Sequence, residues 1–257
     1  MGVDTVLIDI DGVLTTSWKP LPGAVDAIKR LRADGLSIAL VTNTTSRTRS
    51  SIADTLIDAG FPITADDVLT APAVTAAYLA QEHPGARCLL LNHGDIRADF
   101  GDIELVDDDP DVVVLGGAGV EFGYDALNTV FGHLCRGAAL VAMSASMYWR
   151  TDEGLQLDTG AFLAGLQDAA GVRATVTGKP AAEFFTAALG RVGGKPESSL
   201  MIGDDLDSDV LAAQRCDITG VLVRTGKFRA ETLDASEDKP DHVIDSIADL
   251  PGLLAES

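Results

Sequence analysis

The sequence has few cysteines and few basic side chains. Its three cysteines are scattered along 257 residues, so they form neither a disulfide framework nor a metal-binding spacing, as is usual in a reducing cytoplasm. It has 19 basic residues against 39 acidic ones, for a formal net charge of -20. Because nucleic acids and anionic lipids are bound through basic surfaces, we expect neither as a partner.

Long hydrophobic runs are also missing. No stretch of about 18 uninterrupted apolar residues occurs, so we expect no membrane-spanning helix and no membrane partner. No charged segment precedes a long apolar run near the first residues, so we expect no signal peptide. Together with the cysteine usage, these absences predict a cytoplasmic protein.

Short apolar runs alternate with segments of helical periodicity. Several runs are continuous rather than alternating, which is typical of parallel strands buried on both faces. Strands are predicted at 5–10, 37–41, 68–70, 87–91, 112–115, 139–142, 199–202, 220–223 and 242–244. Helices are predicted at 22–34, 47–59, 73–82, 124–136, 160–170, 181–192 and 207–215. This order predicts an α/β fold with a doubly wound, Rossmann-like parallel sheet.

The number of strands is high for a single sheet. We therefore expect the middle of the chain, 73–175, to form an inserted α/β cap domain. The core domain then consists of 1–72 plus 176–257.

Two carboxylates follow the first predicted strand. Asp9 and Asp11 lie two residues apart, so in extended chain they point to the same side, and Gly12 allows the backbone to turn. An Asp-Gly turn would explain Asp11 and Gly12. It does not explain Asp9, because a carboxylate inside an apolar run is costly to bury without a partner.

Polar and basic residues follow at two more predicted boundaries. Thr42 and Asn43 begin a hydroxyl- and amide-rich segment at the end of a strand, just before a helix, where donors suit an oxyanion; a simple N-cap is the alternative. Lys179 lies before Pro180 at the start of the helix 181–192. Lys195 precedes a strand and is expected at the opposite edge of the sheet, so Lys179 is favoured as the ligand-binding lysine.

The last candidate segment is strongly acidic. Asp204, Asp205, Asp207 and Asp209 follow a strand and open a helix, and helix capping accounts for only one or two of them. A calcium-binding loop starting at Asp205 is excluded, since its sixth and twelfth positions are not Gly and Glu. Carboxylate oxygens are the ligands that Mg²⁺ prefers, and with a carboxylate nucleophile and a lysine they indicate phosphoryl transfer.

These four segments, in this order, resemble the motifs of the haloacid dehalogenase-like superfamily: DxD, Thr or Ser, Lys, and GDxxxD. The insertion resembles the class IIA cap of the 4-nitrophenyl phosphatase type. Two branches are closest in pattern, that of haloacid dehalogenase-like domain-containing protein 2 and that of the phospholysine phosphohistidine inorganic pyrophosphate phosphatases. The resemblance implies a phosphatase that cleaves a small phosphorylated metabolite (a phosphomonoester, phosphoamide or pyrophosphate) through an aspartyl-phosphate. A dehalogenase, or a catalytically silent binding or regulatory protein with this fold, is the alternative.

The resemblance also implies roles for residues. Asp9 is the nucleophile and Asp11 the general acid and base. Mg²⁺ is held by Asp9, the Asp11 carbonyl and Asp204, while Thr42, Asn43 and Lys179 bind the phosphoryl group. Asp205 and Asp209 are expected behind these ligands, Asp209 orienting Lys179 or a metal-bound water.

Substrate choice is expected to lie in the cap, where this sequence departs from its sugar-phosphate-cleaving relatives. The candidate residues are Met147, Tyr148, Trp149, Asp158 and Thr159. Simple packing of the aromatic residues inside the cap is the alternative. The sequence does not determine the oligomeric state, and a homodimer through the cap is left open.

Overall fold

The structure is a computed structural model that describes residues 2–151 and 154–255, without the side chains of 149–151. The chain divides into two compact units. The first contains the described residues up to Thr42, Arg49–Leu69 and the described residues from Lys179 onward. The second contains Asn43–Thr48 and Thr70–Gly178, so it extends three residues beyond the expected insertion at each end and also includes a short linker.

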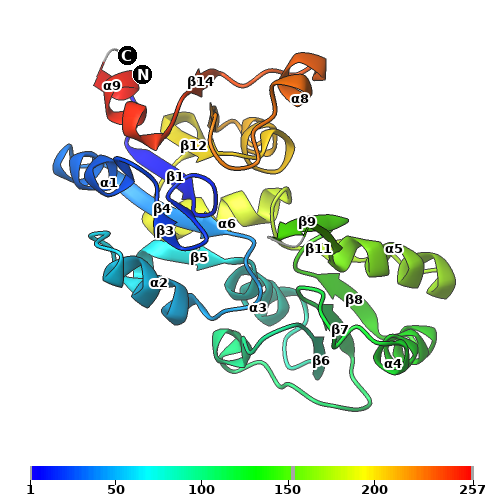
Figure 1. The fold of residues 1–257 in the computed structure, drawn as a ribbon. Coiled ribbons are helices and arrows are strands. Elements are labelled where there is room, and N and C mark those ends of the chain that lie inside the picture. Colours follow the sequence, from blue (N-terminus) through cyan, green and yellow to red (C-terminus); the bar gives the residue numbers. More distant parts are fainter. Residues whose placement is uncertain (1, 152–153, 256–257) are drawn as a thin grey trace. The chain divides into compact units, whose positions relative to one another are not determined.

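The first unit is built on a six-stranded sheet with the order β14-β13-β12-β1-β4-β5 (Figure 1). The pairings of β1 with β12 and β4, of β12 with β13 and of β13 with β14 are all parallel. The strands are β1 (Thr5–Asp9), β4 (Ser37–Thr42), β5 (Val68–Thr70), β12 (Ser199–Gly203), β13 (Thr219–Val223) and β14 (His242–Ile244). This arrangement confirms the predicted α/β fold with a doubly wound parallel sheet.

Helices cover both faces of this sheet because the side chains of each strand alternate between the faces. On one face, α1 (Ala24–Ala33) and α2 (Arg49–Asp58) pack their buried residues against Val6 and Ile8 of β1. On the other face, Leu222 of β13 packs with η4 (Leu206–Leu211). The helix α6 (Ala182–Val192) contacts β1 and β4 and carries the fully buried Phe184 and Phe185. The remaining helices of this unit are α7 (Ala212–Gln214), α8 (Ala230–Ala235) and α9 (Leu250–Ala255).

The second unit has its own sheet and its own core. Its four strands are parallel, in the order β11-β8-β7-β6, with β6 (Cys88–Leu91), β7 (Val112–Leu115), β8 (Ala139–Ala142) and β11 (Thr175–Val176). A hydrophobic cluster joins this sheet to α4 (Tyr124–Cys135) and α5 (Thr159–Ala170). The helix α3 (Ala71–Glu82) and an antiparallel pair, β9 (Tyr148–Thr151) with β10 (Gly154–Leu157), complete the unit.

The elements that the sequence did not predict are short. The strands β2 (Thr15–Thr16) and β3 (Lys19–Pro20) form a hairpin whose turn residues, Ser17 and Trp18, both have positive φ. β9, β10, β11, α8 and α9 have two to six residues each, too few for a periodic pattern. The predicted helix 207–215 begins as a π-helical turn in η4 and continues only briefly as α7.

The described part of the chain has no helix that is both long and apolar enough to cross a membrane. Cys88, Cys135 and Cys216 are all free thiols.

Two neighbouring residues of α2 offer a test of the core assignment. Leu56 is fully buried and belongs to the main hydrophobic cluster, whereas Ile57 is 44% exposed. Replacing Leu56 with Ala should lower the free energy of unfolding by about 2–5 kcal/mol, because it removes buried methyl groups and leaves a cavity. Ile57→Ala should cost less than about 1 kcal/mol. Chemical denaturation of both variants measures the difference, and equal losses would contradict the packing described.

Candidate active site

The candidate residues gather at one edge of the six-stranded sheet. Asp9 is the last residue of β1, Thr42 is the last residue of β4, and Asp204 directly follows β12. These three strands are parallel neighbours, so their carboxyl ends meet at the same edge, where ligands bind in such sheets. Lys195 lies just before β12, at the opposite edge, as expected from the sequence.

A buried lysine joins two of the carboxylates. The Nζ atom of Lys179 donates to Oδ1 of Asp9 and to Oδ1 of Asp209, both at 2.6 Å. All three side chains are buried. Charge-assisted hydrogen bonds of this length are strong, and they offset part of the cost of removing three charges from water.

Asp204 has one satisfied and one unsatisfied oxygen. Its Oδ2 accepts a hydrogen bond of 2.8 Å from the main-chain N–H of Lys227. Its Oδ1 is buried and has no hydrogen-bond partner among the described residues. Leaving a buried carboxylate oxygen without a partner costs free energy, and a bound ligand such as a metal ion would remove that cost.

Three carboxylates stand close enough to hold one cation. Oxygen atoms of Asp9, Asp204 and Asp209 lie within 4.8 Å of one another. The ammonium of Lys179 bonds two of them, so these four groups together keep two negative charges when all are ionised. A divalent cation would neutralise this excess, and carboxylate oxygens are the ligands that Mg²⁺ selects.

The pKa values of these groups reflect their burial first and the neighbouring charges second. Burial raises the pKa of Asp9 well above its ordinary value; Lys179 opposes this rise, and Asp209 and Asp204 add to it. Burial, together with Asp209, raises the pKa of Asp204 to about 7. Burial lowers the pKa of Lys179, but Asp209 and Asp9 raise it by more. The net pKa is above the ordinary value, so Lys179 stays protonated.

The two carboxylates expected behind the ligands have different positions. Oδ1 of Asp209 accepts a hydrogen bond from Lys179, and its Oδ2 accepts one from the N–H of Asp205 at 3.3 Å. Gly203 is required beside it, because a Cβ at residue 203 would collide with the Asp209 side chain. Asp205 instead caps η4, accepting from the N–H groups of Asp207 and Ser208.

The remaining candidates of the catalytic motifs are Asp11, two residues after Asp9, and the pair Thr42 and Asn43 at the end of β4. Asp11 is exposed, in a turn closed by a hydrogen bond from the N–H of Gly12 to the carbonyl of Thr15. Thr42 is buried at the end of β4, and Asn43 is half-buried. Asn43 packs against Gly178, where a Cβ would lie 2.9 Å from its Oδ1.

The predicted specificity residues of the second unit fall into two groups. Met147 and Tyr148 are 53% and 62% exposed, so they are not packed inside that unit. Trp149 belongs to β9, but its side chain lies outside the described part of the chain. Asp158 caps α5, and Thr159 is buried with its hydroxyl donating to the carbonyl of Gly116. Both therefore have structural contacts within the unit.

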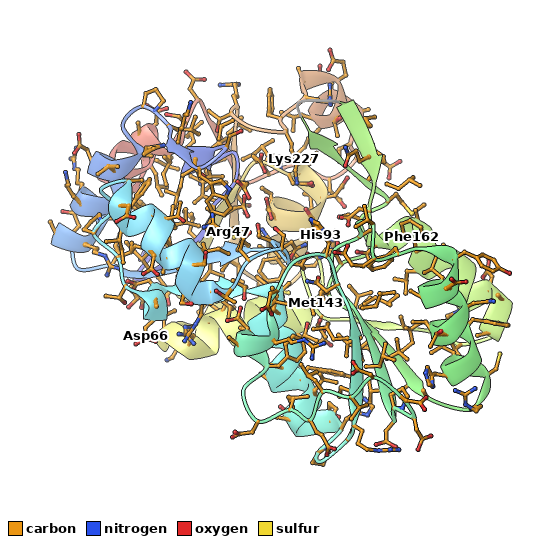
Figure 2. All side chains as sticks on the ribbon, turned by 60° about the horizontal axis from the view of Figure 1, so that its bottom comes forward. Arg47, Asp66, His93, Met143, Phe162 and Lys227 are labelled. Carbon is orange, nitrogen blue, oxygen red and sulfur yellow. The ribbon has the colours of Figure 1, made fainter. Side chains whose placement is uncertain are left out.

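Sequence reasoning missed the hydrogen bonds that Asn92 makes to two other segments. Asn92 directly precedes His93, which Figure 2 labels. The Nδ2 atom of Asn92 donates to the carbonyl of Thr45 at 3.0 Å, and its Oδ1 accepts from the N–H of Gly117 at 2.8 Å. The linker Asn43–Thr48 is thereby tied to the ends of β6 and β7. An amide at the end of a strand was the only available signal, and it is a weak one.

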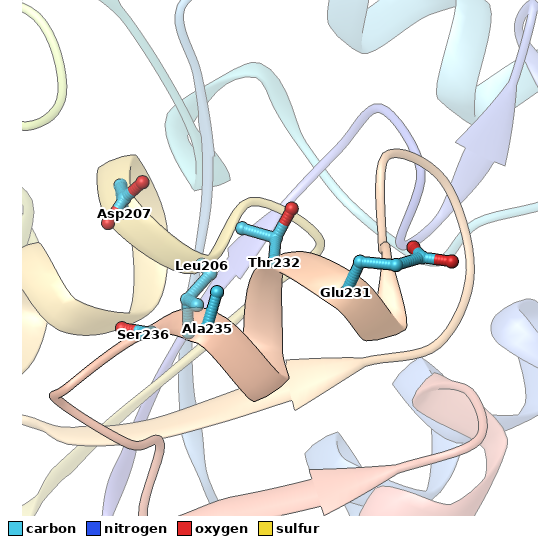
Figure 3. Close-up of a pocket in the computed structure, with 6 residues that line it drawn as sticks. All are labelled: Leu206, Asp207, Glu231, Thr232, Ala235 and Ser236. Atoms are coloured by element: carbon cyan, nitrogen blue, oxygen red, sulfur yellow. The ribbon is translucent and has the colours of Figure 1, made fainter.

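A separate pocket of about 460 Å³ lies between η4 and α8 (Figure 3). It is lined by Leu206, Asp207, Glu231, Thr232, Ala235 and Ser236. Two of these side chains are acidic and none is basic, so the pocket is unsuited to an anionic substrate.

Comparison with known proteins agrees with this geometry. Residues 6–105 match the model of the haloacid dehalogenase-like hydrolase family, and residues 176–250 match a second, HAD-hydrolase-like model. The phospholysine phosphohistidine inorganic pyrophosphate phosphatase of Xenopus laevis is 37% identical over 263 residues, covering 100% of this chain and 96% of the relative. The haloacid dehalogenase-like hydrolase domain-containing protein 2 of Bos taurus is 39% identical over 238 residues, covering 93% and 89%.

Solved structures share the fold over nearly the whole chain. A p-nitrophenyl phosphatase from Archaeoglobus fulgidus has a TM-score of 0.92 and 27% identity, covering 98% of this chain and 99% of its own. A glycerol phosphate phosphatase from Mycobacterium tuberculosis, solved in complex with magnesium, has a TM-score of 0.87 and 30% identity, covering 97% and 76%. The resemblance seen in the four sequence motifs is confirmed, and the chain belongs to the haloacid dehalogenase-like hydrolases.

Proposed function

We propose that this protein is a Mg²⁺-dependent phosphatase that hydrolyses small phosphorylated metabolites through a phosphorylated Asp9. The observation that carries the proposal is the buried Lys179, bonded to Asp9 and Asp209 beside the unpartnered oxygen of Asp204. A carboxylate nucleophile, a fixed ammonium and a cation site are the parts that phosphoryl transfer requires. The phosphatase names of the relatives and structural neighbours support the same reaction class.

Asp9, Asp204 and the main-chain carbonyl of Asp11 are the groups that would hold Mg²⁺. The clustering of the carboxylate oxygens of Asp9, Asp204 and Asp209, and the orphaned Oδ1 of Asp204, fit such an ion. When bound, Mg²⁺ supplies positive charge to the phosphoryl oxygens and to the carboxylates around them. The magnesium complex of the glycerol phosphate phosphatase is in keeping with this choice.

The chain's own residues account for the remaining chemistry. A carboxylate oxygen of Asp9 attacks phosphorus while the bond to the leaving oxygen breaks, and Asp11 gives its proton to that oxygen. Asp11 then takes a proton from a water molecule whose oxygen attacks the phosphorus, which releases phosphate and restores Asp9. Lys179 holds the Asp9 carboxylate in position through its hydrogen bond to Oδ1. Thr42 and Asn43 donate to the phosphoryl oxygens.

A non-catalytic binding protein is the less favoured alternative. Burying a lysine between two carboxylates has a desolvation cost, and apolar side chains of similar size would avoid it. A protein that only binds has no physical need for this arrangement. Three further points stay predictions: the role of the second unit in selecting the metabolite, the cytoplasmic location, and a dimer through the cap.

The nucleophile is tested by Asp9→Asn. The amide cannot attack phosphorus, so kcat for 4-nitrophenyl phosphate should fall on the order of a thousandfold or more. Circular dichroism should show the native fold, and fluorine NMR should detect a beryllium fluoride adduct in the parent protein but not in the variant. Asp58→Asn, an exposed change at the end of α2, is the matched control and should keep full activity. Substantial turnover by Asp9→Asn would refute the covalent mechanism.

The metal site is tested by the pH dependence of Mg²⁺ binding. Since the pKa of Asp204 is raised from 3.8 to about 7, the folded protein keeps a proton between these values that the unfolded chain has lost. The stability of the metal-free protein contributed by this group therefore falls as the pH rises from about 4 to about 7. Mg²⁺ must displace that proton, so its increase of the melting temperature should be small at pH 5 and larger at pH 8.

Thermal unfolding with Mg²⁺ or with a chelator, at both pH values, measures this effect. Asp204→Asn should remove the pH-dependent increase, whereas Asp207→Asn, an exposed carboxylate three residues later, should preserve it. An increase of equal size at both pH values, or one that survives in Asp204→Asn, would show that Asp204 is not a ligand.

A further inference from the structure

The segment 225–227 lies against two parts of the candidate site. It follows β13, whose neighbour in the sheet is β12, which in turn pairs with β1. The hydroxyl of Thr225 donates to the carbonyl of Gly12, and the N–H of Lys227 donates to Oδ2 of Asp204 at 2.8 Å. The segment is therefore attached both to the turn that carries Asp11 and to the carboxylate proposed as a metal ligand.

The middle residue of the segment has to be a glycine. Gly226 has a φ of +63°, in the left-handed region that other residues rarely adopt. A Cβ at this position would collide with Oδ2 of Asp204 and with the Cα of Gly12. This close approach fixes the start of the Lys227 side chain at the rim of the site.

The ammonium of Lys227 differs from that of Lys179 in its surroundings. Lys179 is buried and bonded to two carboxylates, whereas the side chain of Lys227 is 70% exposed. The Nζ atom of Lys227 lies 3.7 Å from Oδ2 of Asp205, beyond hydrogen-bond distance. Because an exposed pair of this kind is weak, a ligand can recruit Lys227 at little cost.

Lys227 also brings a positive charge close to an acidic part of the site, since its side chain lies near Asp205 and its main-chain N–H bonds Asp204. In a chain with a net charge of -20, a positive charge beside the site favours the approach of an anionic group.

The turn to which this segment is attached carries the residue that would meet the leaving group. In an in-line displacement, the attacking Asp9 and the leaving oxygen are on opposite sides of the phosphorus, and the leaving oxygen takes its proton from Asp11. Gly12 follows Asp11 in the chain and is held by Thr225. The segment that carries Lys227 is therefore attached to the turn whose Asp11 would give its proton to the leaving oxygen.

We propose that Lys227 is a specificity-determining residue that binds a second anionic group carried by the leaving group of the substrate. This inference rests on the proposed phosphatase function and narrows its substrate class to phosphorylated compounds whose leaving group is itself negatively charged. Inorganic pyrophosphate is the smallest compound of this class, because its leaving group is a second phosphate.

The test compares pyrophosphate with 4-nitrophenyl phosphate, whose leaving group carries no charge in the substrate. Lys227→Met should lower kcat/KM for pyrophosphate about tenfold to a hundredfold, the value of one charge-assisted hydrogen bond, at a constant concentration of free Mg²⁺. For 4-nitrophenyl phosphate the change should stay within about threefold, since the phosphoryl contacts are untouched. Lys227→Arg should restore most of the pyrophosphate activity, because it keeps the charge.

Lys195→Met is the matched control, since it removes the same charge at the opposite edge of the sheet. Equal losses on both substrates, or an unchanged ratio of the two in Lys227→Met, would overturn the inference, as would an equal effect of Lys195→Met. A parent enzyme that cleaves 4-nitrophenyl phosphate but not pyrophosphate would also overturn it while leaving the phosphatase function intact. Failure to cleave either would refute that function itself, and the inference with it.

Discussion

The candidate site depends on one interaction, the ammonium of Lys179 held between the carboxylates of Asp9 and Asp209. The three groups come from the end of β1, the approach to α6 and the turn η4. None of these charges could stay buried alone, because an ionised group in a protein interior is costly without a partner. Lys179 thus makes the burial of Asp9 tolerable, and the second carboxylate fixes the lysine in turn.

The order of the parallel strands determines what surrounds this interaction. Since β13, β12, β1 and β4 are consecutive in the sheet, the residues at their carboxyl ends become neighbours although the chain separates them widely. Asp204 meets the N–H of Lys227 in this way, and the turn at Gly12 meets Thr225. Two glycines, at 12 and 226, make the approach possible, so the backbone itself forms part of the site. Close backbone packing of this kind suits a reaction that depends on positioning.

Much of the fold was predictable because the long elements have strong periodic or continuous apolar patterns. The strand Val112–Leu115 was predicted with its observed bounds, since four buried aliphatic residues follow an acidic turn. The hairpin β2–β3 was not, because two-residue strands carry no period and its turn uses Ser17 and Trp18 at positive φ in place of glycine or asparagine. The role of Asn92 was missed for a related reason: its partners, Thr45 and Gly117, are 47 and 25 residues away.

The sequence by itself determined the class of the protein, the edge of the sheet at which the site lies, and the residues that carry charge there. It did so because strand ends, helix starts and an excess of carboxylates are local features. Only the tertiary structure decided which atoms meet: that Lys179 bonds Asp9 and Asp209, that one oxygen of Asp204 is satisfied by a main-chain N–H and the other is not, and that Lys227 stands beside them. These contacts span 23 to 170 residues of chain, and their geometry follows from strand order and close backbone approach, which no local pattern encodes.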